Sequence, residues 1–187
     1  MMMIETRPTM ESDAPAIEAL LDKSFGPDRE KKTAYRLREG VASIATLGRV
    51  AFDGDELRGS IAYWPVQVRL KKDGALLPAL LLGPLAVDPV HRGEGVGIRL
   101  MEETLESASR LGHRLVILVG DLDYYARVGF HRDGTEDLRL PGPVDQDRVL
   151  IRNLQGDDFG ALDGAIESVL ETHRAQQGSM LAEEQRT

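Results

Sequence analysis

The N-terminal part of the chain shows a short strand-like segment followed by helical periodicity. Residues 3–7 predict a first strand. Four apolar residues then recur at helical spacing: Ile17, Leu20, Leu21 and Phe25. They predict a helix that begins after a cap at Ser12 or Asp13 and ends at Gly26. A second, more polar helix is predicted over residues 28–39.

The middle of the chain changes to strand patterns. Residues 49–52 and 57–68 predict the two strands of a hairpin, because Asp53-Gly54-Asp55 between them suits the positive φ of a tight turn. Residues 76–87 form a nearly continuous apolar run, which predicts a strand buried on both faces. Its Gly83-Pro84 pair predicts a bulge or a separation from a neighbouring strand, since proline lacks the N–H that a sheet ladder needs.

A glycine-rich segment and a long helix follow that strand. The segment covers residues 88–97, and helical spacing continues to about Leu111. Residues 115–119 predict a buried strand, residues 121–128 a short helix, and residues 149–154 a last strand. This order of strand, loop, helix and strand predicts a mixed α/β fold around a βαβ core.

The length of 187 residues favours one main domain, which we place at residues 1–154. Residues 155–187 are then a C-terminal extension. Within it we expect a helix over Asp157–Glu171 and a frayed polar tail after Met180.

Composition narrows the function classes. The chain has 23 Lys plus Arg against 31 Asp plus Glu, a net charge of −8, so nucleic acid is not an expected partner. It has no cysteine, which excludes disulfides and a thiol nucleophile and favours a cytoplasmic location. The 13-residue apolar stretch Ala75–Val87 is too short to span a membrane. The histidines lack metal-ligand spacing, so no metal is expected.

The loop Arg92–Gly97 predicts an anion site, because free backbone N–H groups and the helix dipole meet at a helix N-terminus. A Walker A loop is excluded, since no Gly-Lys-Ser/Thr follows. A dinucleotide fingerprint needs glycine where Ile98 stands. The remaining interpretation is a loop that binds the pyrophosphate of coenzyme A.

Arg92-Gly93-Glu94-Gly95-Val96-Gly97 resembles the Gln/Arg-x-x-Gly-x-Gly/Ala motif of the GNAT superfamily of N-acetyltransferases. Tyr125-Ala126-Arg127-Val128-Gly129-Phe130 resembles its Tyr-x-x-x-Gly-Phe segment, and Leu85-Ala86-Val87-Asp88-Pro89 resembles the strand end before its loop. The resemblance covers about residues 83–130. It implies the GNAT fold, a mostly antiparallel central sheet with splayed strands flanked by helices, and acetyl-CoA as co-substrate.

By this resemblance, the pantetheine of acetyl-CoA contacts the backbone of Leu85, Ala86 and Val87. The pyrophosphate contacts the whole loop, which consists of Arg92, Gly93, Glu94, Gly95, Val96 and Gly97. The expected reaction is direct attack of a primary amine on the thioester, with no acyl-enzyme.

The resemblance aligns Tyr125 with the family's catalytic tyrosine, by its distance from Gly129-Phe130, and so makes it the candidate general acid. A phenol with a pKa of about 10 suits that role for a leaving thiolate with a pKa of about 8.5. The competing interpretation is that Tyr125 only packs against the cofactor. We assign the adjacent Tyr124 to structure. Asp121 is the first candidate for the base, ahead of Asp88 and Asp123, although an aspartate at this position also suits a turn or helix cap.

The acceptor is expected to be an amine of a small molecule, peptide or protein, bound between residues 25–38, the central strands and the chain after Phe130. The resemblance also favours a homodimer. The alternative function is a non-catalytic acyl-CoA sensor on the same fold, and a nucleotide-binding oxidoreductase is a more distant one.

Overall fold

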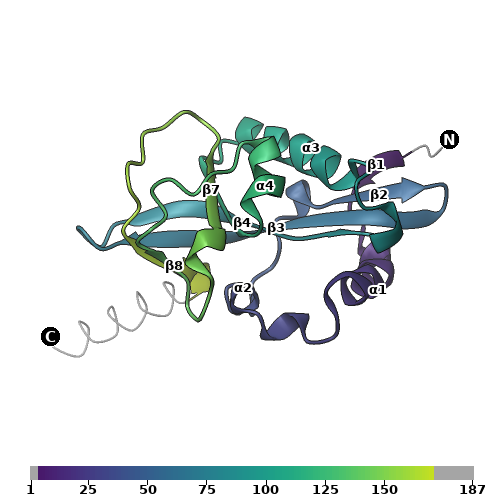
Figure 1. Cartoon of the computed structure of the whole chain (residues 1–187), viewed down its shortest axis with the longest axis horizontal. Helices are drawn as coiled ribbons and strands as arrows, with labels where there is room; N and C mark the ends of the chain where they lie inside the picture. Colours follow the sequence, from purple (N-terminus) through teal and green to yellow (C-terminus); the bar gives the residue numbers. More distant parts are fainter. Residues whose placement is uncertain (1–3, 171–187) are drawn as a thin grey trace, which may run out of the picture.

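A computed structural model describes residues 4–170, which form one sheet with helices on both faces (Figure 1). Helices α3 (Val96–Arg110) and α4 (Leu122–Tyr125) lie on one side, and α1 (Ala14–Phe25) and α2 (Thr33–Arg36) on the other. The strands are β1 (Ile4–Pro8), β2 (Arg49–Asp53), β3 (Glu56–Leu70), β4 (Leu76–Val87), β5 (Leu115–Val119), β6 (Leu138–Arg139), β7 (Val149–Asn153) and β8 (Gly164–Ser168).

The sheet is mostly antiparallel, as predicted, and its strands lie in the order β1-β2-β3-β4-β5-β7. β4 and β5 are parallel neighbours joined through α3, which is the expected βαβ unit. β3 is long enough to pair with β2 along its first half and with β8 along its second half. The observed bounds of β3, β4, β5 and β7 lie within two residues of the predicted ones.

β4 separates from β5 halfway along its length, which confirms the splayed strands. The two strands pair only at Leu80↔Val116 and Leu81↔Ile117. Just beyond, Gly83-Pro84 coincides with a register shift against β3, between Ile61 and Tyr63. The edge of β4 after Leu81 therefore faces a gap instead of a strand.

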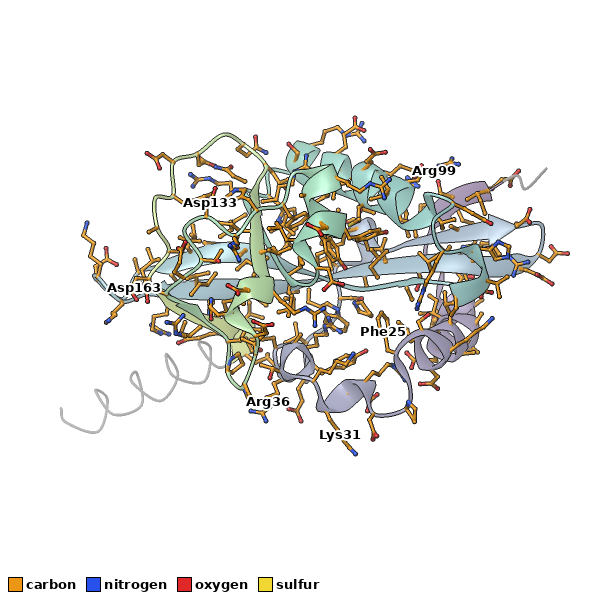
Figure 2. The ribbon with its side chains drawn as sticks, viewed as in Figure 1. Phe25, Lys31, Arg36, Arg99, Asp133 and Asp163 are labelled. Atoms are coloured by element: carbon orange, nitrogen blue, oxygen red, sulfur yellow. The ribbon has the colours of Figure 1, made fainter. Side chains whose placement is uncertain are left out.

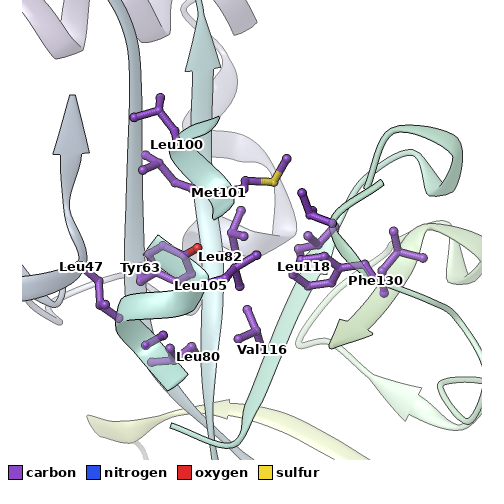
Figure 3. Packing of buried hydrophobic residues seen from close by; sticks show 14 of the residues in the cluster. Leu47, Tyr63, Leu80, Leu82, Leu100, Met101, Leu105, Val116, Leu118 and Phe130 are labelled. Carbon is purple, nitrogen blue, oxygen red and sulfur yellow. The ribbon is translucent and has the colours of Figure 1, made fainter. Parts of the chain in front are cut away.

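The buried residues alternate between the two faces of the sheet, as period-two strands require. On the α3 face, Leu80 and Leu82 of β4 lie beside Val116 and Leu118 of β5 (Figure 3). On the opposite face, Ala79 and Leu81 lie in a second cluster with Leu115 and Ile117. Both faces of β4 and β5 are therefore covered, which explains their continuous apolar sequences.

Leu105 lies inside the cluster under α3 and is 1% exposed. Replacing it by alanine should lower the free energy of unfolding by about 2–5 kcal/mol, because the lost side chain leaves a cavity. Urea denaturation followed by circular dichroism measures this. Leu111, at the end of the same helix and 57% exposed, is the matched control. Leu111→Ala should change stability by about 0.5 kcal/mol or less; equal losses would contradict the packing of α3.

The predicted helix over residues 28–39 is wrong. The chain forms a 3-10 turn at Arg29–Lys31, an extended Lys32, and the short helix α2. Tertiary contacts replace a continuous helix: Arg29 pairs with two acids of α1, and the Thr33 hydroxyl donates to the Pro143 carbonyl at 2.6 Å. Such contacts outweigh helix propensity in so short a segment.

The predicted helix over Asp157–Glu171 is also wrong within the described residues. β8 lies there and pairs antiparallel with β3, from Val66↔Ser168 to Leu70↔Gly164. The part of β3 beyond β2 would otherwise expose its N–H and C=O groups, and β8 satisfies them. The sheet thus continues past the domain boundary predicted at residue 154, and residues 149–154 are not the last strand. The tail after Met180 lies outside the described residues.

Candidate functional site

The loop between β4 and α3 depends on glycine for its backbone conformation. Gly93 and Gly95 have φ values of 88° and 83°, in the left-handed region that other residues rarely adopt. A Cβ at either position would meet no atom within 4 Å. The loop surface is therefore open, and the first N–H groups of α3, which have no partner within the helix, lie at its end.

Gly97 is needed for a different reason. It lies in the first turn of α3, and a Cβ there would lie 2.2 Å from the hydroxyl oxygen of Tyr124. The Tyr124 ring thus packs against the start of α3 and brings its hydroxyl to the loop. Burial raises the pKa of Tyr124, so the hydroxyl keeps its proton at neutral pH.

Asp88 holds the start of the loop. Its carboxylate accepts from Lys23 at 2.8 Å and from the Val90 N–H at 3.2 Å, and Arg58 lies 3.3 Å away. The hydrogen bond from Lys23 is the main reason that the pKa of Asp88 lies below its usual range. A carboxylate held by two cations is a poor base, so Asp88 is better explained as an anchor.

The charged residues of the loop differ in their freedom to bind a ligand. Nδ1 of His91 lies 3.0 Å from a carboxylate oxygen of Glu94, so these two side chains are engaged with each other. Arg92 is exposed and forms no salt bridge within residues 4–170. Its guanidinium is available for a phosphate.

A cavity of about 940 Å³ joins the loop to the gap between β4 and β5. Predicted site residues that line it are Leu85, Val87, Arg92, Gly93, Gly95, Val96, Gly97, Asp121 and Tyr125. Ala86 and Glu94 do not: Ala86 is buried toward α1, and Glu94 is turned to His91. The structure thus brings most of the predicted residues to one cavity.

Tyr125 is the last residue of α4, the short helix that follows β5. Its ring packs edge-on against Tyr124 and Phe130, with centroid distances of 5.1 Å and 6.0 Å. Gly120 makes room for it, because a Cβ there would lie 2.2 Å from the ring. Burial, reinforced by Tyr124 and Asp121, raises the pKa of Tyr125 to about 12. The hydroxyl therefore keeps its proton at physiological pH.

Asp121 lines the same cavity, but its side chain is 79% exposed and lies 3.3 Å from Arg148. Its backbone carbonyl accepts from the N–H groups of Tyr124 and Tyr125, both at 3.1 Å. Asp121 thus occupies the turn position that the sequence analysis also allows. Its role as a base stays a prediction.

The far wall of the cavity comes from two segments distant in sequence, Phe25–Arg38 and Pro143–Arg148. Figure 2 shows Phe25 on the side of the first segment that faces the sheet, with Lys31 on its outer side. These are segments in which the sequence analysis expects the acceptor. The sequence patterns did not single out Arg38, and they assigned Tyr124 to structure alone. The one signal for Tyr124 was its position next to Tyr125.

Within residues 4–170, no three His, Asp or Glu side chains are grouped so that they could hold a metal ion. No helix in that range has the length and apolar character needed to cross a bilayer.

Known proteins match both the sequence and the fold. A family model for the acetyltransferase (GNAT) domain matches residues 5–132. The uncharacterized N-acetyltransferase YhbS of Escherichia coli K12 is 36% identical over 156 residues, which is 83% of this chain and 90% of that protein. YjhQ, an uncharacterized N-acetyltransferase from the same organism, is 29% identical over 74% of this chain and 76% of its own length.

Solved structures agree with these matches. The crystal structure of E. coli YhbS in complex with CoA has a TM-score of 0.73 at 34% identity, covering 90% of this chain and 91% of that one. A GNAT family acetyltransferase from Brucella melitensis, in complex with acetyl-CoA, shares the fold, with a TM-score of 0.62 at 24% identity over 89% and 96% of the two chains. This chain therefore belongs to the GNAT family of N-acetyltransferases.

Proposed function

We propose that this protein transfers the acetyl group of acetyl-CoA directly to a primary amine. The observation that carries the proposal is the single cavity in which the open edge of β4, the glycine loop and Tyr125 meet. Binding of CoA by YhbS and of acetyl-CoA by the B. melitensis protein supports the choice of donor.

The residues present fit acetyl-CoA on structural grounds. The edge of β4 from Leu82 to Val87 lacks a strand neighbour on the β5 side, so its backbone groups can pair with an amide-containing chain such as pantetheine. Leu85, Ala86 and Val87 would supply those contacts. Arg92, the N–H groups of residues 93–97 and the start of the α3 dipole would hold the pyrophosphate.

Acetyl-CoA supplies the activated acyl group, and the protein supplies position and proton transfer. The amine nitrogen attacks the thioester carbon, the C–S bond breaks, and the thiolate takes a proton for which Tyr125 is the source. The high pKa of Tyr125 is compatible with this step, because the burial that raises it also raises the pKa of a thiol held beside it.

The acceptor amine must lose its proton before attack. For a lysine-like amine of pKa about 10.4, this costs about 4.6 kcal/mol at pH 7, whereas an α-amine of pKa about 7.8 costs about 1 kcal/mol. Asp121, at the edge of the cavity, is our candidate to receive that proton, directly or through water.

Calorimetric titration with acetyl-CoA tests the donor, with NAD and ATP as controls. We expect micromolar binding of acetyl-CoA alone, followed by thiol release in the presence of an amine. Binding without thiol release across a broad amine panel would contradict catalysis, and equal binding of NAD would contradict the assignment of the loop.

We also propose a cytoplasmic homodimer, for which light scattering of the purified protein measures the subunit number.

A further inference from the structure

Arg38 is a half-buried cation without an anionic partner within residues 4–170. Its Nε and Nη1 atoms are shielded from solvent and donate to no hydrogen-bond acceptor, and no carboxylate within residues 4–170 forms a salt bridge with it. Burial lowers the pKa of Arg38 to about 10, with Tyr35 offsetting part of the effect, so the guanidinium stays charged at neutral pH. A charge with unsatisfied donors is costly to bury unless a ligand pairs with it.

Two aromatic side chains hold this guanidinium in place. Its Cζ lies 4.5 Å from the ring centroid of Tyr35 and 5.9 Å from that of Trp64. These contacts stabilise the cation, while its Nε and Nη1 atoms stay without a hydrogen-bond acceptor. The Tyr35 hydroxyl and Trp64 Nε1 are also buried without hydrogen-bond partners within the described residues. Three neighbouring side chains thus offer unused donors.

The position of Arg38 separates it from the phosphate end of the site. It lines the main cavity and also a second cavity of about 520 Å³, and Tyr35 and Pro84 likewise line both. Nη2 of Arg38 lies beside Gly83, 3.3 Å from where a Cβ would be. Gly83 is roughly 13 Å along β4 from Val87, where the phosphate loop begins. Arg38 therefore lies toward the acceptor side.

The other charges nearby are already compensated or exposed. Arg29 lines both cavities too, but it pairs with Glu18 and Asp22. Glu11 and Glu30 line the second cavity and are exposed. An anion at the junction of the two cavities would therefore meet Arg38 as its unpaired partner.

We propose that Arg38, with Tyr35 and Trp64, binds a carboxylate of the acceptor, so that the substrate is a primary amine that also carries a carboxylate. This inference rests on the proposed N-acetyltransferase function and adds the substrate class. The carboxylate is unchanged in the reaction: the amine gains the acetyl group and loses a proton, and the CoA thiolate gains one.

Trp64 allows a binding test that needs no turnover, because it is the only tryptophan in the chain. The probes are free amino acids, dipeptides and the matching amino-acid amides, added to protein saturated with CoA. We expect a saturable change in tryptophan fluorescence with a carboxylate-bearing amine and none with its amide. Dipeptides distinguish a free amino acid from a peptide as the source. No saturable response to any acid would overturn the proposal.

Variants of Arg38 give the second test. In Arg38→Met, which keeps most of the apolar volume, kcat/KM for the carboxylate-bearing amine should fall at least about 30-fold, as expected for a lost charged hydrogen bond. For the matching amide, kcat/KM should change less than about threefold. Arg38→Lys should lose less than Arg38→Met, because it keeps the charge but not the planar fork.

Arg36→Gln is the matched control, since Arg36 is the last residue of α2, only two residues before Arg38, is exposed and donates to the Pro141 carbonyl instead of lining either cavity (Figure 2). An equal fall in kcat/KM for acid and amide in Arg38→Met would mean that Arg38 has a structural role and would overturn the proposal. Failure of the wild-type protein to bind acetyl-CoA would instead contradict the proposed function, and the Trp64 titration separates the two results.

Discussion

Replacing Gly95 by glutamate should lower the affinity for acetyl-CoA by at least about 100-fold, which corresponds to about 2.7 kcal/mol. Gly95 precedes the first turn of α3, and a side chain there enters open space at the proposed phosphate site. Two like charges about 4 Å apart near a protein surface repel by about 4 kcal/mol before salt screening. Calorimetric titration with acetyl-CoA measures the change.

Gly95→Gln separates charge from backbone strain. Glutamine has nearly the same size as glutamate, and either residue must adopt the φ of 83° at position 95. Both variants therefore carry the same conformational cost. We expect Gly95→Gln to bind more tightly than Gly95→Glu, with the difference shrinking as salt is added. Equal affinities in the two variants would mean that residue 95 does not face a phosphate, and an unchanged affinity in Gly95→Glu would remove the loop from the binding site.

Replacing Tyr125 by phenylalanine should lower kcat by about 100-fold, the usual effect of losing a general acid. The affinity for acetyl-CoA should change less than about threefold, because the ring still packs against Tyr124 and Phe130. Steady-state kinetics by thiol release, together with calorimetry, measures both quantities. A matched loss of kcat and affinity would favour the interpretation that Tyr125 only packs against the cofactor.

Tyr63→Phe is the control for the loss of a buried tyrosine hydroxyl. Tyr63 is fully buried, its hydroxyl lies 2.8 Å from that of Thr104, and it lines neither cavity. This variant should lose about 1 kcal/mol of stability while kcat is unchanged. In the wild type, ionisation of Tyr125 should cause no loss of kcat at any pH under about 10, since the pKa of Tyr125 is raised to about 12. A decline with a lower midpoint that disappears in Tyr125→Phe would contradict this assignment.

The central unit of the fold could be predicted from the sequence because its signals are local. The run over β4 has no polar position to expose on either face, and the structure covers both. Gly93 and Gly95 mark backbone conformations that few other residues tolerate. The segment from Tyr125 to Phe130 likewise contains a single short turn, whose conformation depends on neighbouring residues only.

The remaining features depend on contacts between distant segments. Residues 28–39 have helix-forming residues, yet pairing of Arg29 with α1 and of Thr33 with Pro143 divides them. Residues 164–168 become a strand because β3 extends past β2 and needs a neighbour. Local propensity cannot predict either outcome, since the deciding partner is far away in the chain.

The sequence by itself therefore determined the βαβ unit, the glycine loop before α3 and the position of Tyr125, because period, turn geometry and helix ends are properties of consecutive residues. Only the tertiary structure decided where β4 leaves β5, which segments close the cavity and which charges remain unpaired. Arg38 illustrates the reason. In the sequence it is one of several charges in a polar segment, and only its packing between Tyr35 and Trp64 leaves Nε and Nη1 buried without a hydrogen-bond partner.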